Sequence, residues 1–168
     1  MLSNVEIKAK AGNWERQAAI ARALADRTEN LIQEDTFFHC PEGRLKLREI
    51  RGGESELIFY RRAHLKGPKG SVYCLSTVKD AGSMKALLGS ALGLGRTIKK
   101  KRTLFLAGQT RIHFDEVEGL GRFIELEVCM KAGQDPSEGE AIARSFMERL
   151  GISEADLLDS AYADMLRS

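Results

Sequence analysis

The sequence predicts an α+β domain in which about eight strands form an antiparallel barrel or a strongly curved sheet. Short strand-like runs, separated by turns that contain glycine or proline, follow one another from about residue 35 to residue 132. Helical patterns are few and interrupt this region only once. The 168 residues suit a single domain, and a hydrophobic content of 43% can form a core without disulfides.

The chain begins with a strand and a helix. Polar and apolar residues alternate in NVEIKAK, as expected for a strand with one buried face. From about Asn13 to Arg27, apolar residues recur at helical spacing, and Asn13 is placed as an N-cap. We expect Trp14 to pack this helix against the exterior of the sheet.

Seven further strands and three further helices complete the pattern. One helix, from about Asp80 to Leu92, interrupts the strands. A second begins at Ser137, with Glu140 in the capping-box position, and a third begins at Ser153. The predicted strands are DTFFHC, RLKLREI, ELIFYRRA, SVYCLST, RTIKKKRTLFLA, QTRIHFDEV and RFIELEVCM.

The composition argues against several classes of protein. The 26 Lys and Arg nearly balance the 24 Asp and Glu, which is a poor basis for nucleic-acid binding. No stretch approaches the roughly 18 consecutive apolar residues of a membrane span, and no targeting segment is seen. The three cysteines lack disulfide or zinc-site spacing. We expect a cytoplasmic monomer or homodimer that binds neither nucleic acid nor a membrane.

Several strands carry charged residues at alternate positions, which places these residues on one face. For a single strand the simplest interpretation is a solvated face. The opposite faces are strongly apolar, however, and helices packed outside a barrel would cover them. The charged faces would then point inward. The charged sets are Glu6, Lys8 and Lys10; Arg44, Lys46 and Arg48; Arg111, His113 and Asp115; and Glu125 and Glu127.

Such an interior would be rich in Lys and Arg, with a few carboxylates, and its cations would repel one another without a ligand. A triphosphate with Mg²⁺ or Mn²⁺ matches this chemistry. Ammonium and guanidinium groups bind phosphate oxygens, and carboxylate oxygens bind hard divalent cations. The sequence therefore predicts a small-molecule triphosphate as the partner, with Mg²⁺ or Mn²⁺ as the cofactor.

Six blocks carry a resemblance to a known family. They are NVEIK, GRLKLRE, LIFYRR, KKKRTLF, TRIHFDEVEGLGRFIELEV and SAYADML. They resemble the CYTH family, or triphosphate tunnel metalloenzymes, whose first strand reads Glu-x-Glu-x-Lys. The family includes class IV adenylyl cyclases, thiamine triphosphatases and inorganic triphosphatases, and the blocks are most similar to the cyclase-like members. The resemblance implies one domain over residues 1–168, a closed eight-stranded antiparallel barrel with helices outside.

The resemblance also implies roles for individual residues. The candidate catalytic residues are Glu6, Lys8 and Arg111. Alternation alone does not decide which face Arg62, Lys100 and Arg102 occupy, so their assignment rests on the resemblance. The implied phosphate-binding cations are Lys8, Lys10, Lys46, Arg48, Arg62, Lys100, Arg102 and Arg111, and the implied metal ligands are Glu6, Glu125 and Glu127.

One position departs from the family pattern. Asn4 stands where the first Glu is expected, which removes a negative charge from the metal site. Asp115, with the parity of Arg111 and His113, is our candidate replacement ligand. Asn4, Tyr60 and His113 are candidate substrate contacts, although Tyr60 and His113 equally suit packing and hydrogen-bonding roles inside a barrel.

The resemblance favours conversion of ATP to cyclic AMP and pyrophosphate. Two alternatives stay open. One is a triphosphatase that hydrolyses inorganic triphosphate or an organic one such as thiamine triphosphate. The other is a noncatalytic protein that binds nucleotide or polyphosphate, which the loss of a carboxylate at Asn4 makes credible.

Overall fold

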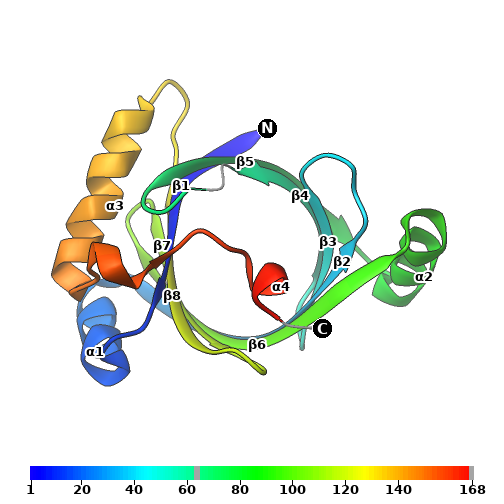
Figure 1. The fold of residues 1–168 in the computed structure, drawn as a ribbon, viewed down its shortest axis with the longest axis horizontal. Coiled ribbons are helices and arrows are strands. Elements are labelled where there is room, and N and C mark those ends of the chain that lie inside the picture. Colours follow the sequence, from blue (N-terminus) through cyan, green and yellow to red (C-terminus); the bar gives the residue numbers. More distant parts are fainter. Residues whose placement is uncertain (63–64, 167–168) are drawn as a thin grey trace.

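The computed structural model describes residues 1–62 and 65–166, and its centre is a ring of strands (Figure 1). Around the ring the antiparallel order is β5-β4-β3-β2-β6-β7-β8-β1, and pairing of β1 with β5 closes it. This confirms the closed eight-stranded barrel. The strands are β1 (Leu2–Lys10), β2 (Arg27–Phe38), β3 (Arg44–Ile50), β4 (Ser55–Arg62), β5 (Lys69–Val78), β6 (Leu94–Ala107), β7 (Thr110–Val117) and β8 (Gly121–Cys129).

Helices surround this barrel. Figure 1 shows α1 (Trp14–Leu24) and α3 (Pro136–Leu150) on one side of the ring and α2 (Ala81–Leu92) on the other. The short α4 (Tyr162–Met165) lies across the opening of the ring. A two-residue strand, β9 (Leu157–Leu158), pairs with β1 just before α4. None of the helices in the described ranges has the length and apolar character needed to cross a lipid bilayer.

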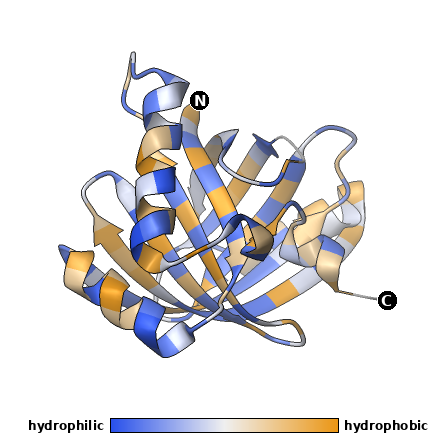
Figure 2. Cartoon of the chain, turned by 60° about the vertical axis from the view of Figure 1, so that its left-hand side comes forward, coloured by the Kyte–Doolittle hydropathy of each residue, from blue (hydrophilic) through white to orange (hydrophobic). Residues whose placement is uncertain are grey.

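The largest apolar core lies between the outer face of the barrel and helices α1 and α3. Its strand residues alternate with inward-facing ones, and this alternation is visible as colour along the strands in Figure 2. Ile112 and Leu126 are fully buried there. The rings of Trp14 and Phe114 meet edge to face with centroids 4.9 Å apart. Trp14 therefore packs α1 against the barrel exterior, as the sequence predicts.

Helix α2 covers a different part of the outer face. Its residues Met84 and Leu88 pack against a cluster that contains Phe38 of β2 and Leu47 of β3. Leu47 is fully buried. Because helices cover apolar outward residues such as Leu47 and Ile112, the residues that alternate with them, such as Lys46 and Arg111, face inward.

The C-terminal segment lies over one end of the barrel. Tyr162 and Ala163 of α4 pack against Ile98, Val117 and Phe123, which are inward-facing residues of β6, β7 and β8. Arg44, at the start of β3, donates to Asp164 at 2.6 Å. The C-terminal segment therefore covers part of this end of the interior with apolar side chains.

Two predicted boundaries near α1 are wrong. The helix ends at Leu24, where Ala25 adopts an extended conformation, and β2 begins at Arg27 instead of about Asp35. Residues 27–34 are extended because they pair with β6, from Arg27 opposite Leu106 to Glu34 opposite Lys99. Long-range pairing outweighs the local pattern here.

Two predicted helix starts near the C-terminus also differ. Helix α3 begins at Pro136 because the Asp135 side chain, not that of Ser137, accepts a hydrogen bond from a backbone N–H of the first turn, at 2.8 Å. Ser153 begins only a single 3₁₀ turn, Glu154–Asp156, after which the chain turns extended as β9. Ala63, the last residue of the fourth predicted strand, lies outside the described residues.

Candidate functional site

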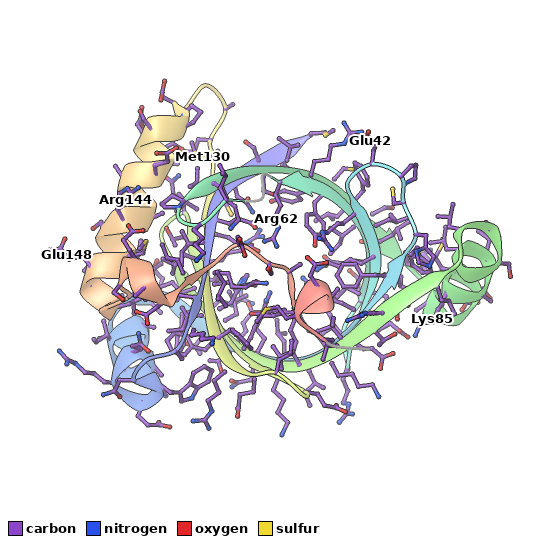
Figure 3. The ribbon with its side chains drawn as sticks, in the orientation of Figure 1. Glu42, Arg62, Lys85, Met130, Arg144 and Glu148 are labelled. Carbon is purple, nitrogen blue, oxygen red and sulfur yellow. The ribbon has the colours of Figure 1, made fainter. Side chains whose placement is uncertain are left out.

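The barrel interior contains a cavity of about 480 Å³, within the size range of small-molecule sites. Figure 3 shows Arg62 directed into the ring, whereas Arg144 and Glu148 of α3 point away from it. Among the described residues, seven cationic and five acidic side chains line the cavity, which leaves an excess of positive charge. They are Lys8, Lys46, Arg48, Arg62, Lys100, Arg102 and Arg111, with Glu6, Asp35, Glu56, Glu125 and Glu127.

Three of the cations converge on Asp35. Lys46 Nζ, Arg48 Nε and Lys100 Nζ lie 2.9, 2.7 and 3.2 Å from its carboxylate oxygens. Burial opposes ionisation of Asp35, but the charges of Arg48, Lys100 and Lys46 outweigh it and hold the pKa of Asp35 well below its usual value. Burial and the neighbouring Arg48 lower the pKa of Lys46 to about 7. The single carboxylate of Asp35 thus holds three cationic side chains together on one side of the cavity, and it neutralises only part of their charge.

A second network joins β1, β6, β7 and β8. Arg102 donates to both oxygens of Asp115 at 2.6 Å and to Glu125 at 2.9 Å. Lys8 Nζ lies 3.1 Å from the other oxygen of Glu125 and 3.5 Å from the centroid of the Tyr162 ring. Burial lowers the pKa of Lys8, although Glu125 opposes this. Lys8 and Arg102 are therefore fixed in place before any ligand binds.

Two further ion pairs line the cavity. Arg62 Nη1 donates to Glu6 at 2.7 Å, and Arg111 lies 3.7 Å from Glu127. Burial raises the pKa of Glu6, because the attraction of Arg62 does not offset its loss of hydration. The Arg111 side chain is 43% exposed, so it can meet a ligand that enters from solvent.

Three residues of β7 and β8 form a group that can hold a metal ion. One ligand atom from each of His113, Glu125 and Glu127 lies within 4.8 Å of the others. His113 Nδ1 is buried without a hydrogen-bond partner among the described residues, 3.6 Å from Glu125 and 3.9 Å from Glu127. Burial also lowers the pKa of His113, which favours the neutral imidazole that binds metals. An unpartnered nitrogen facing two carboxylates fits a divalent cation, and the oxygen donors suit Mg²⁺ or Mn²⁺.

Comparison with known proteins agrees with this geometry. The CYTH domain matches residues 2–162, nearly the whole chain. This chain belongs to the CYTH family. No curated protein matches it in sequence.

Solved structures share the fold of this CYTH chain. The PH1012 protein of Pyrococcus horikoshii OT3 has a TM-score of 0.86 at 23% identity, with 98% of this chain and 99% of that chain covered. A candidate adenylate cyclase of Vibrio parahaemolyticus has a TM-score of 0.81 at 21% identity, with 96% of each chain covered. A candidate adenylyl cyclase of Hippeastrum, described as having a dominant triphosphatase activity, has a TM-score of 0.61 at 16% identity, with 94% and 91% covered. At these identities the likeness shows the fold alone.

Most residues that the resemblance singled out lie together in the CYTH barrel, including Arg62, Lys100 and Arg102, whose faces alternation left undecided. Tyr60 and His113 also line the cavity. Lys10 does not: it is exposed at the end of β1, beyond the lined part of the barrel. The predicted position of Lys10 inside the cavity is therefore wrong, because the last residue of β1 lies beyond the end of the cavity.

Asp115 and Asn4 differ in their position relative to the cavity. Asp115 is completely buried behind Arg102, which binds both of its oxygens, and it does not line the cavity. The geometry therefore does not bring Asp115 to the position of the missing carboxylate. Asn4 does line the cavity, and its Oδ1 is buried without a partner among the described residues.

Sequence reasoning missed two residues that organise this CYTH cavity. The sequence pattern places Asp35 in a strand, but only the register of β2 with β3 and β6 shows that Asp35 lies between Arg48 and Ile98. The alternation of Gln33, Asp35 and Phe37 is the signal that could have placed it inward. Tyr162 lies in the SAYADML block, but no pattern indicates that this segment crosses the end of the barrel.

Proposed function

We propose that this CYTH protein is a metal-dependent enzyme that binds a triphosphate in the barrel cavity and breaks its phosphoanhydride chain, in the first instance by converting ATP to cyclic AMP and pyrophosphate. The observation that carries this proposal is the convergence of seven cationic side chains and one carboxylate–imidazole group on one cavity inside the barrel. A polyanion with a divalent cation is the ligand that such an excess of positive charge best accommodates.

The cationic side chains would act by position and charge. Lys46, Arg48 and Lys100, held together by Asp35, would bind phosphate oxygens on one wall, with Lys8 and Arg102 on the other. Because these groups are already fixed by ion pairs, little reorganisation would accompany the reaction.

His113, Glu125 and Glu127 would hold the divalent cation, and Glu6 lies close enough to influence their charge. When bound, such a cation withdraws charge from phosphate oxygens and so favours attack at phosphorus. The family implies this cofactor, and the donor set in the cavity fits it.

In the cyclase reaction, the ribose 3′-hydroxyl oxygen bonds to the α-phosphorus. The bond from that phosphorus to the bridging oxygen breaks, pyrophosphate leaves, and the hydroxyl proton is released. The cationic walls would stabilise the charge that develops on the departing pyrophosphate.

Hydrolysis is the second candidate, favoured by the state of Glu6. Its burial and raised pKa make it a stronger base than an ordinary carboxylate, and Arg62 orients it. The water oxygen would bond to the terminal phosphorus, and the bond from that phosphorus to the bridging oxygen would break. The diphosphate part of the substrate would leave, and the attacked phosphoryl group would become orthophosphate. The same walls would serve either reaction.

The deciding experiment is incubation of the pure protein with ATP, thiamine triphosphate or inorganic triphosphate, each with Mg²⁺ or Mn²⁺, followed by identification of the products. Cyclic AMP with pyrophosphate supports the cyclase, and orthophosphate supports the triphosphatase. Tight binding without turnover under every condition would leave a noncatalytic polyphosphate-binding protein and end the enzyme proposal.

A matched pair of variants tests the site. Lys8 and Lys10 share one face of β1, but Lys8 is 3% exposed and paired with Glu125, whereas Lys10 is exposed outside the cavity. Lys8→Ala and Glu6→Ala should each reduce turnover at least about a hundredfold. Lys10→Ala should leave turnover unchanged. Full activity in both Lys8→Ala and Glu6→Ala would show that the cavity is not the catalytic site.

A further inference from the structure

The C-terminal segment contacts Lys8 in two ways. Leu158 of β9 pairs with the backbone of Lys8 on β1. In addition, Lys8 Nζ lies 3.5 Å from the centroid of the Tyr162 ring, well within the distance at which an aromatic face attracts a cation. Lys8 is 3% exposed and Tyr162 is 6% exposed, so little water competes for this contact. Because Tyr162 also lines the cavity, a segment remote in sequence contributes an aromatic surface to the charged interior.

The same ring lies between the two networks of the cavity. Lys100, which belongs to the cations around Asp35, has its Nζ 5.5 Å from the centroid of the Tyr162 ring. The ring of Phe123 packs against that of Tyr162 with centroids 5.2 Å apart. Tyr162 therefore offers one fixed aromatic surface to a cation of each network.

Hydrogen bonds and ion pairs join Tyr162 to Lys8 in a closed circuit. The Tyr162 hydroxyl donates to Asp115 at 3.0 Å, and Asp115 accepts two hydrogen bonds from Arg102. Arg102 donates to one oxygen of Glu125, and Lys8 Nζ lies 3.1 Å from the other. The five side chains come from α4, β7, β6, β8 and β1 in that order. Each of them contacts two others of the circuit, so a change at Tyr162 reaches Lys8 from both sides.

The two contacts of Lys8 differ in their dependence on a metal ion. Glu125 is a candidate metal ligand, and its attraction for Lys8 would weaken when it binds a divalent cation. The attraction of the Tyr162 ring for Lys8 involves no metal ligand. The ring is therefore the contact that can keep the Lys8 ammonium in place when the metal group is occupied.

We infer that Tyr162 is a positioning residue of the cavity, which holds the Lys8 ammonium toward the bound phosphates and so makes the C-terminal segment part of the triphosphate site. This inference rests on the proposed triphosphate function and adds to it a residue that acts through Lys8. A segment that merely covered the barrel end would contribute to stability without changing the affinity of the folded protein for a ligand.

The test is calorimetric binding of inorganic triphosphate at constant Mn²⁺, under conditions in which urea denaturation shows each variant to be folded. Tyr162→Leu removes the aromatic face and should weaken binding about tenfold, whereas Tyr162→Phe keeps the face and should stay within about threefold of the parent. Met165→Ala is the control, because Met165 packs in the same apolar cluster but offers no aromatic face. A loss in Met165→Ala or in Tyr162→Phe as large as that in Tyr162→Leu would overturn the inference.

A double variant shows whether Tyr162 acts through Lys8. In a Lys8→Met background, Tyr162→Leu should weaken binding less than about twofold further, because the side chain that the ring positions is already absent. An undiminished tenfold effect in that background would mean that Tyr162 acts by another route, and would refute the inference alone. Absence of binding by the parent protein would instead refute the proposed function.

The charge distribution of the ring provides a second measurement that keeps the shape of the side chain, for use where Tyr162→Leu fails to fold. Pentafluorophenylalanine at position 162 resembles the phenylalanine of Tyr162→Phe in shape, but its ring face repels cations. The fluorinated protein should bind inorganic triphosphate about fivefold more weakly than Tyr162→Phe. Equal affinity in these two proteins would show that the aromatic face does not position Lys8.

Discussion

The guanidinium of Arg102 donates to both carboxylate oxygens of Asp115, and each nitrogen–oxygen distance is 2.6 Å. Arg102 is 5% exposed and Asp115 is not exposed at all, so this two-point pair is desolvated. A third bond, to Glu125 at 2.9 Å, ties Arg102 to the candidate metal group. Asp115 thus holds Arg102 in a position that faces the cavity, although Asp115 itself does not line the cavity.

Asp115→Asn should therefore lower the free energy of unfolding by about 3 kcal/mol, because Arg102 loses a buried partner but keeps Glu125. Urea denaturation measures this change, and Glu116→Gln, at an exposed neighbouring position, should stay within about 0.5 kcal/mol of the parent protein. Mn²⁺ affinity should change less than about threefold in Asp115→Asn. A loss of tenfold or more would instead place Asp115 among the metal ligands.

The pH dependence of triphosphate binding should report on Lys46, which faces Asp35 of β2, Arg48 of β3, Lys100 of β6 and Tyr60 of β4. Its pKa is about 7 in the folded protein, against an ordinary value of 10.5. A polyanion binds the protonated form, so inorganic triphosphate affinity should fall as the pH rises through 7. Calorimetric titration on both sides of pH 7 measures this slope.

The stability of the ligand-free protein should change with pH in the opposite direction to the binding affinity. Between pH 7 and 10.5 the unfolded chain holds the Lys46 proton more tightly than the folded protein does, so Lys46 makes the ligand-free protein more stable as pH rises through this window. Lys46→Met should flatten both slopes, and Lys66→Met, at an exposed position, should flatten neither. A binding slope that survives in Lys46→Met would assign the titration to another group.

Strand alternation predicted much of this cavity because a barrel has only two faces. Once helices cover the apolar face, residues at i and i+2, such as Lys46 with Arg48 and Arg111 with His113, must face inward. The same rule fails for Lys10, because parity does not show where along its strand the cavity ends.

Other features depend on contacts between distant parts of the chain. Asp35 meets Arg48 and Lys100 only because β2 pairs with β3 and β6 in one particular register. Tyr162 reaches Asp115 across 47 positions of sequence, after the chain has crossed the barrel end. Neither turn residues nor hydrophobic periodicity carries that information, so the sequence alone could not predict these contacts.

Metal binding should depend on His113 and Glu127. Substituting His113→Ala or Glu127→Gln should weaken Mn²⁺ binding at least about tenfold, because each removes one of the three ligand atoms. Electron paramagnetic resonance of free Mn²⁺ measures this without reference to activity. His39→Ala is the control, since His39 is exposed and lies outside the cavity. If both site variants bind Mn²⁺ as tightly as the parent protein, the metal must bind at another position.

The attachment of the C-terminal segment to the barrel should depend on Tyr162, whose hydroxyl donates to Asp115 at 3.0 Å and whose ring centroid lies 5.2 Å from that of Phe123. Tyr162→Phe removes one buried hydrogen bond and should lower the free energy of unfolding by about 1 kcal/mol. Tyr162→Ala also removes the ring and should lower it by about 3–5 kcal/mol. Urea denaturation separates the two, with exposed Asp159→Asn as control. Equal losses in Tyr162→Phe and Tyr162→Ala would mean that the hydroxyl alone holds this segment in place, and that the packing of the ring contributes nothing.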